Sequence, residues 1–121
     1  MRVGIDGILQ RQATNLSGGE RQKLALARGM IREPKVLFLD EPCAALDGRA
    51  TREIEQLLHQ IAADGTRLIM STHDMGQARR LADDVVFLLS GRVHETGAAR
   101  DFFKAPQTEA AQAFLRGDIV E

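Results

Sequence analysis

The most constraining feature of the sequence is a continuous apolar run, VLFL at residues 36–39, that is closed directly by Asp40, Glu41 and Pro42. A short run of this kind suits a β-strand that is buried on both faces, as in a parallel sheet. A helical pattern precedes it, another follows, and residues 67–72 form a second stretch that also suits a strand. This alternation predicts an α/β fold with a mostly parallel sheet flanked by helices.

The helix before this strand is predicted over residues 17–32. Ser17 and Glu20 have the spacing of a capping box, in which each side chain bonds the backbone of the other residue. Pro34 would end the helix, since proline disfavours helical geometry in the residue before it. The predicted apolar face consists of Leu24, Ala27 and Ile31.

The helix after this strand is predicted to begin at Asp47, a favourable cap, and to stop at Gly65. Its apolar stripe has helical spacing and consists of Ile54, Leu57, Leu58 and Ile61. The rest of the chain is predicted to contain a short helix, two paired strands around a Ser-Gly turn, and two short helices. These elements are placed at Met75 to Leu81, Val85 to Leu89, Arg92 to Glu95, 98–104 and 108–116.

Length and charge exclude several classes of protein. The chain has 121 residues, which is one domain or less. Its 16 basic and 17 acidic residues give a formal charge of -1, so composition offers no reason to expect nucleic-acid or lipid binding. No apolar run in it approaches the ~20 residues that span a bilayer. Cys43 is the only cysteine, so the chain cannot form an internal disulfide.

A glycine pair at the start of the first helix forms a candidate anion site. The glycines leave backbone N–H groups open to close approach, and a helix N-terminus adds unpaired donors and a partial positive charge. These features suit phosphate, although the same pattern also fits a plain capped helix. The residues are Leu16, Ser17, Gly18, Gly19 and Glu20.

The ends of the two predicted strands carry the candidate catalytic groups. Carboxylates at the carboxyl end of a buried parallel strand lie where α/β folds place ligand chemistry. Asp40 could hold Mg²⁺, directly or through a water, and Glu41 could orient or deprotonate an attacking water. His73 follows the strand of residues 67–72, where an imidazole could bond a phosphate oxygen. The other histidines, His59 and His94, are interpreted as structural or merely exposed.

In order and spacing, these motifs resemble the ATP-binding subunits of ABC transporters. Residues 16–20 resemble the ABC signature motif, and residues 36–41 resemble the Walker B strand with its catalytic glutamate. Residues 45–47 resemble the D-loop, and residues 71–74 resemble the switch-histidine region. The resemblance covers essentially the whole chain and implies part of the P-loop NTPase (ABC ATPase) fold.

The resemblance implies a head-to-tail dimer in which two subunits enclose ATP and Mg²⁺. The signature residues, Ser17 to Gly19, would contact the γ-phosphate of ATP held by the opposite subunit. Asp40 would help to bind Mg²⁺, Glu41 would act on the hydrolytic water, and His73 would contact the γ-phosphate. The D-loop residues would reach across the dimer interface, and they are Ala45, Leu46 and Asp47.

One departure from the family pattern is mild. Cys43 and Ala44 stand where Thr or Ser is common. Cys43 is expected to be an inert, reduced side chain.

The resemblance also implies partners and a location. Transmembrane permease subunits and a solute-binding protein would complete an importer, with this chain peripheral to the cytoplasmic face of the cell membrane. Residues 73–97 look most like importers of small oxyanions such as tungstate or phosphate. The layout would be a helical-subdomain remnant at 1–33, half of a catalytic core at 34–97, and C-terminal helices at 98–121.

No G-x-x-x-x-G-K-[ST] loop occurs in the printed sequence, although ATP binding in this family depends on one. The chain is therefore expected to be a fragment, a truncated gene product or one half of a split protein, with no ATPase activity by itself. The strand of that loop would lie between residues 67–72 and 85–89. Its absence would expose strand edges and apolar faces, so marginal stability and aggregation are expected.

Two alternatives stay open. The chain could be a regulatory or vestigial partner that completes the ATP site of a full-length subunit in trans. The soluble ABC proteins of translation or DNA repair are the second alternative, and the sequence disfavours them. Ala44 and Ala45 stand where translation factors carry Asn-His, and no sustained heptads of the kind found in repair proteins occur.

Overall fold

A computed structural model describes residues 17–117 of the chain. They form two compact units that divide between His73 and Asp74. The first unit contains two helices and a parallel pair of strands, and the second contains an antiparallel pair with three short helices.

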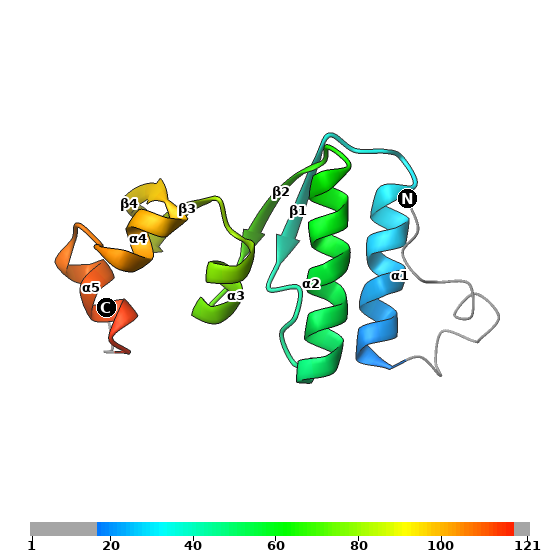
Figure 1. Ribbon diagram of the computed structural model, residues 1–121, viewed down its shortest axis with the longest axis horizontal. Coiled ribbons are helices and arrows are strands. Elements are labelled where there is room, and N and C mark those ends of the chain that lie inside the picture. Colours follow the sequence, from blue (N-terminus) through cyan, green and yellow to red (C-terminus); the bar gives the residue numbers. More distant parts are fainter. Residues whose placement is uncertain (1–16, 118–121) are drawn as a thin grey trace. The chain divides into compact units, whose positions relative to one another are not determined.

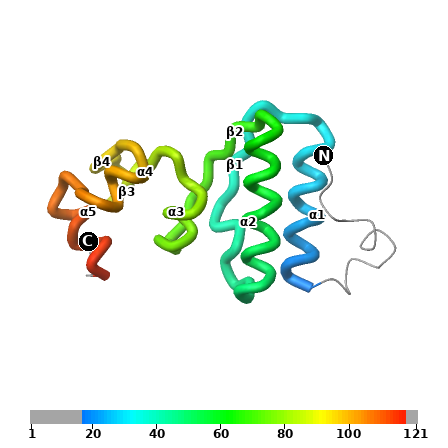
Figure 2. The backbone as a smooth tube through the Cα atoms, in the orientation of Figure 1, coloured from blue at the N-terminus to red at the C-terminus, as the bar shows by residue number. Residues whose placement is uncertain are grey.

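The first unit alternates helix and strand in the predicted order: α1 (Gly18–Met30), β1 (Val36–Asp40), α2 (Gly48–Ala63) and β2 (Arg67–Ser71). The strands pair in parallel, and Asp40 faces Ser71 at the carboxyl end of the pair. Within this unit α2 lies beside the strands and α1 lies beside α2 (Figures 1 and 2).

Side-chain caps begin both helices of the first unit, as the sequence predicted. The Glu20 N–H donates to Ser17 Oγ at 3.1 Å, and the Ser17 N–H donates to Glu20 Oε1 at 3.2 Å, which together form the capping box. Asp47 Oδ1 accepts a 2.7 Å bond from the Ala50 N–H and starts α2. Gly65, at φ +103°, follows the end of α2 in a conformation that glycine adopts without strain.

The core of the first unit is formed by side chains of its two helices. Its most buried side chains are Leu26, Ile54, Leu58 and Ile61. The stripe predicted for α2 is confirmed at Ile54, Leu58 and Ile61, while Leu57 is half-buried, and the face predicted for α1 is wrong in part. Leu26, outside that predicted face, is buried, and Ile31 is 76 % exposed because it lies past the last helical turn.

The prediction that β1 is buried on both faces is also wrong within the described residues. Exposure alternates along both strands, and Phe38 is 74 % exposed. Val36 and Ile69 are exposed on the same face, because the parallel register pairs Phe38 with Ile69. Residues at alternate strand positions point to opposite faces, so the half-buried side chains point the other way. Those side chains are Leu37, Leu39, Leu68 and Met70.

The second unit follows the predicted element order. Its elements are α3 (Met75–Leu81), β3 (Asp84–Leu89), β4 (Arg92–Ala98), α4 (Ala99–Lys104) and α5 (Glu109–Leu115). The predicted hairpin is confirmed. Ser90 and Gly91 both have positive φ, the geometry of a two-residue turn that matches the twist of antiparallel strands.

Aromatic rings form the core of the second unit. The Phe87 ring centroid lies 6.0 Å from that of Phe102 and 5.2 Å from that of Phe114. The Glu95 carboxylate accepts bonds from the N–H groups of Gln107 and Thr108, at 2.8 and 3.0 Å, and so joins β4 to the start of α5.

None of the helices within residues 17–117 is long and apolar enough to cross a lipid bilayer. The fold is α/β, with the parallel strands in one two-stranded sheet and the antiparallel strands in another.

Candidate functional site

Four polar side chains gather at the carboxyl end of the parallel strand pair. Asp40 is the last residue of β1 and Glu41 follows it, while Ser71 is the last residue of β2 and His73 lies two positions beyond. Because both strands run in the same direction, their carboxyl ends meet at one edge of the sheet, and the register pairs Asp40 with Ser71. The sequence placed the two acids and the histidine at one edge, and the structure brings them together there.

Ser71 ties this cluster together. Its hydroxyl donates a short hydrogen bond to Asp40 Oδ1. The Glu41 N–H donates to the Ser71 carbonyl at 2.9 Å and to Ser71 Oγ at 3.2 Å. These bonds connect Asp40 and the first residue after β1 to the end of β2, so both acidic residues are tied to the second strand.

Glu41 has an unusual backbone conformation. Its φ of +44° lies in the left-handed region, which residues other than glycine rarely adopt. Strain of this kind persists only where surrounding contacts determine the conformation, and the bonds to Ser71 supply such contacts. The conformation places Glu41 Oε1 3.4 Å from His73 Nε2.

The carboxylate and the imidazole remain open to a ligand. The Glu41 side chain is 42 % exposed and that of His73 is 86 % exposed. A partly exposed carboxylate beside an imidazole can hold a water and accept its proton, while the imidazole can donate to an anionic oxygen. The pair therefore has the chemistry needed to activate water beside a phosphate.

Asp40 fits the role of a partial Mg²⁺ ligand. Magnesium bound with a nucleotide takes one or two carboxylates and completes its coordination with waters and phosphate oxygens. Among residues 17–117, no group of three or more His, Cys, Asp and Glu side chains could hold a metal unaided. One exposed carboxylate oriented by Ser71 matches a site that the substrate would complete.

The candidate anion site forms a second cluster, at the start of α1. Gly18 and Gly19 occupy the first turn, where backbone N–H groups have no carbonyl within the helix to bond. A Cβ added at Gly18 would lie 3.2 Å from Leu46 Cδ2, so this turn lies beside the predicted D-loop. Ala45 in that loop has φ +64°, and one carboxylate oxygen of Asp47 caps α2. No described contact joins Gly18 or Gly19 to the cluster around Asp40.

Ser71 was predicted only as the first residue of the segment 71–74, and its bonds to Asp40 and Glu41 were not predicted from the sequence. Pairing the two predicted strands in register would have placed it opposite Asp40 and so identified it. Leu16, the first residue of the predicted signature motif, lies outside the described residues.

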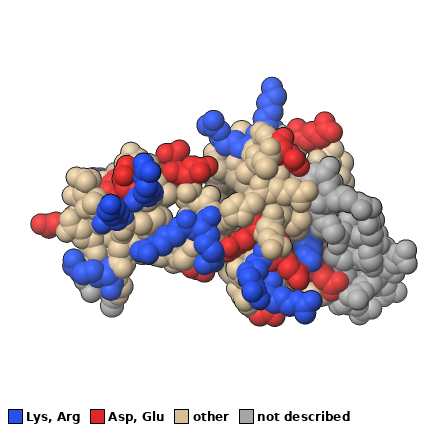
Figure 3. Space-filling model, in the orientation of Figure 1, with Lys and Arg blue, Asp and Glu red and all other residues tan. Residues whose placement is uncertain are grey.

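Basic and acidic side chains are interspersed on the face shown in Figure 3. This agrees with the formal charge of -1 for the whole chain. On the described part of that face, charge does not collect into the single-sign patch typical of a nucleic-acid surface.

Comparison with known proteins gives one family match. Residues 1–44 match the sequence profile of the family described as ABC transporter. This region contains the predicted signature motif and the strand that ends in Asp40 and Glu41.

Two curated relatives match nearly the whole chain. The histidine/lysine/arginine/ornithine transport ATP-binding protein HisP of Escherichia coli is 39 % identical over 119 residues, which are 98 % of this chain and 46 % of HisP. The phosphate import ATP-binding protein PstB of Mycoplasmoides gallisepticum is 41 % identical over 115 residues, which are 95 % of this chain and 35 % of PstB. The chain thus spans less than half the length of these relatives.

A solved structure supports the fold. The dimeric, post-hydrolysis structure of the ATP-binding cassette MJ0796 bound to ADP and Pi aligns with 78 % of this chain and 41 % of its own, with a TM-score of 0.67 and 30 % identity. Sequence and structure therefore lead to the same conclusion: the chain is a homologue of ABC transporter ATP-binding proteins and has part of the ABC ATPase (P-loop NTPase) fold.

Proposed function

We propose that this chain takes part in ATP-driven import as the later portion of an ABC transporter ATP-binding subunit. The observation that carries the proposal is the Ser71-tied cluster, which sets a metal-binding carboxylate beside a second carboxylate and an imidazole. In this role Asp40 helps to hold Mg²⁺, Glu41 orients and deprotonates the attacking water, and His73 donates to the γ-phosphate. ATP supplies the phosphoryl group, and Mg²⁺ neutralises the charge on it.

The start of α1 acts on a different nucleotide. Gly18 and Gly19 present first-turn amides, which suit an anion supplied from outside the chain. We propose that Ser17, Gly18 and Gly19 contact the γ-phosphate of ATP held by a second ATP-binding subunit in a head-to-tail dimer. Leu16 and Glu20 complete this motif, and Ala45, Leu46 and Asp47 contact the same partner.

Import also requires other subunits. The proposal includes transmembrane permease subunits and a solute-binding protein, with the chain held at the cytoplasmic face of the membrane through the permease. HisP is named for amino-acid transport and PstB for phosphate import, so the relatives do not favour oxyanions over amino acids. Import of a small oxyanion therefore rests on the sequence resemblance of residues 73–97 alone.

The proposed dimer can be tested by association with a full-length relative. The purified chain is immobilised and HisP is passed over it with Mg²⁺ and either ATP or ADP. Retention that requires ATP supports the proposal. Gly18→Asp should abolish retention, because its carboxylate would repel the γ-phosphate. The matched control is Ala62→Asp, which adds the same charge at an exposed position near the other end of α2 and should retain HisP normally.

A measurement of ATP hydrolysis tests the expected lack of activity in the isolated chain. We propose that the 121 residues alone hydrolyse no ATP, since the printed sequence contains no phosphate-binding loop. Mg²⁺-dependent hydrolysis by the chain alone that disappears in Glu41→Gln would contradict this.

A fusion experiment distinguishes a catalytic subunit from a non-catalytic partner. If the chain is catalytic, a polypeptide that joins a phosphate-binding loop to it should hydrolyse ATP, and that hydrolysis should depend on Glu41. A non-catalytic partner would give none.

A further inference from the structure

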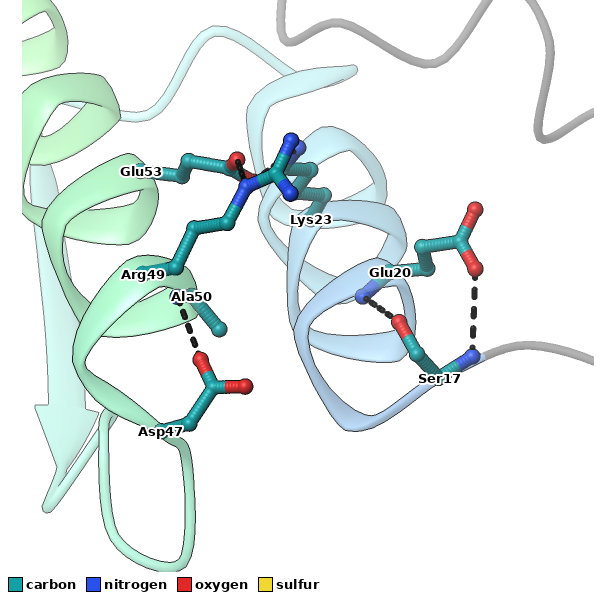
Figure 4. A network of polar contacts seen from close by, with 7 residues as sticks. All are labelled: Ser17, Glu20, Lys23, Asp47, Arg49, Ala50 and Glu53. Atoms are coloured by element: carbon teal, nitrogen blue, oxygen red, sulfur yellow. Dashed lines mark hydrogen bonds and ion pairs between the residues drawn. The ribbon is translucent and has the colours of Figure 1, made fainter.

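The helices α1 and α2 begin at the same level, side by side and in the same direction (Figure 4). Their first residues are Gly18 and Gly48, and each helix carries a charged residue five positions further on, Lys23 in α1 and Glu53 in α2. At a rise of about 1.5 Å per residue, both side chains originate about 7.5 Å from the start of their helices. Equal heights on parallel helices allow these two side chains to meet.

An ion pair joins the helices at this height. Lys23 Nζ lies 2.8 Å from Glu53 Oε2, with side chains that are 21 % and 39 % exposed. Arg49 Nε lies 3.4 Å from the other oxygen, but the Arg49 side chain is 86 % exposed and belongs to the same helix as Glu53. The hydrogen bond and charge of Lys23 are the main causes that lower the pKa of Glu53. Lys23 is therefore the partner that links α1 to α2.

A second contact brings the helices together nearer their starts. A Cβ added at Gly19 would lie only 3.0 Å from Ala50 Cβ, so α1 approaches α2 closely and a larger residue at position 19 would require a small shift of the neighbouring helix. The close approach of Gly19 to Ala50 sets the separation of the helices. The ion pair lies about one turn further on and opposes sliding of one helix past the other.

Two parallel helices that lie side by side need contacts that hold their N-termini together. Each helix has a partial positive charge at its N-terminus, and two N-termini side by side repel one another. The caps at Ser17 and Asp47 fix the start of each helix separately, but neither joins the two. Among the described charged pairs of this unit, the one between Lys23 and Glu53 crosses from α1 to α2.

We propose that Lys23 and Glu53 are positioning residues that hold the first-turn amides of α1 level with Asp47 at the start of α2. Their ion pair makes the signature turn and the D-loop one rigid surface for the partner subunit and its ATP. The functional part of this inference rests on the function proposed above. The geometric part concerns only the first unit and can be tested without a partner.

The geometric test uses a charge swap read by nuclear magnetic resonance. The variants are Lys23→Glu, Glu53→Lys and the double swap, all in the full chain. In the wild type, the Gly19 Hα protons and the Ala50 methyl group should give a nuclear Overhauser effect. Each single swap places like charges together and should weaken this signal by about twofold or more, while the double swap should restore it. Arg49→Ala is the matched control and should leave the signal unchanged.

The functional test measures the affinity of the same variants for HisP with Mg²⁺ and ATP. Each single swap should weaken association by about fivefold, as expected for a partly exposed pair, and the double swap should return it to the wild-type value. Circular dichroism checks that the helices remain folded in every variant. Lys23→Arg, which keeps the charge, should behave as wild type.

The outcomes distinguish the two proposals. If the wild type shows no ATP-dependent association, the proposed function fails, and the nuclear Overhauser signal still decides whether the pair positions the helices. If the wild type associates but single swaps associate equally well, the positioning role is overturned and the function stands. An unchanged Gly19–Ala50 signal in both folded single swaps overturns the geometric part by itself.

Discussion

Alanine substitution at three glycines in the first turns of α1 and α2 should have three different effects on the free energy of unfolding. At Gly48 no atom lies within 4 Å of an added Cβ. The added methyl group favours the helix and restricts the unfolded chain, so Gly48→Ala should stabilise by up to about 1 kcal/mol. At Gly18 the nearest atom is the terminal Leu46 Cδ2 at 3.2 Å, which can rotate away, so the net change should be close to zero.

Gly19 is the informative position. An added Cβ would lie 3.0 Å from Ala50 Cβ and 3.9 Å from Ala50 Cα, and neither atom can rotate away. Relieving this overlap requires α1 to move from α2, which in packed interiors costs about 1–3 kcal/mol. That cost is at least as large as the helix-propensity gain of up to about 1 kcal/mol, so Gly19→Ala should destabilise by up to about 2 kcal/mol.

Urea unfolding followed by far-ultraviolet circular dichroism would measure all three variants. The double variant with Ala50→Gly should show a favourable coupling of about 1–2 kcal/mol, because it removes the overlapping carbon. Gly19→Ala as stable as Gly48→Ala, or no coupling with Ala50→Gly, would refute close packing of the helix starts. The order of stability should be Gly48→Ala, then Gly18→Ala, then Gly19→Ala.

Three further substitutions test other parts of the chain. Leu58→Ala in the core of the first unit should destabilise by about 2–5 kcal/mol in the same urea assay, and a loss below about 1 kcal/mol would contradict its burial. The backbone hydrogen bond from Gln107 lowers the pKa of Glu95 below its usual 4.5, so its stabilising contribution should be complete above that pH and disappear as pH falls through the lowered pKa. Acid titration of Glu95→Gln should therefore show a flatter loss of stability, and a wild-type slope would argue against the contact. Phe38→Thr on the exposed face should change stability by at most about 0.5 kcal/mol and reduce self-association in light scattering.

Local signals in the sequence predicted the helix starts and the hairpin. The capping box at Ser17 and Glu20, the cap at Asp47 and the turn at Ser90 and Gly91 all involve residues within a few positions of one another. Such features depend on short-range hydrogen bonds and backbone preferences, so they can be predicted without knowing the tertiary fold.

Features set by distant residues could not be predicted in the same way. An apolar run cannot reveal whether one or both of its faces are covered, and Phe38 is exposed although its run is uniformly apolar. The role of Ser71 in joining the cluster was not predicted, because its bonds to residues 40 and 41 depend on the register of two strands about thirty residues apart. The roles given to Asp40, Glu41 and His73 remain predictions, although the structure brings these residues to one edge of the sheet.

The left-handed backbone at Glu41 has a consequence for control of this site. Two bonds from its amide to a serine on the neighbouring strand support that conformation, together with a bond from the Ala44 N–H to its carbonyl, while its own side chain stays partly exposed. A shift of β2 that broke those bonds would let the backbone relax and turn the carboxylate away from His73. The direction of this carboxylate would then depend on the position of the second strand, so a displacement of β2 could switch off the proposed chemistry without altering either proposed catalytic side chain.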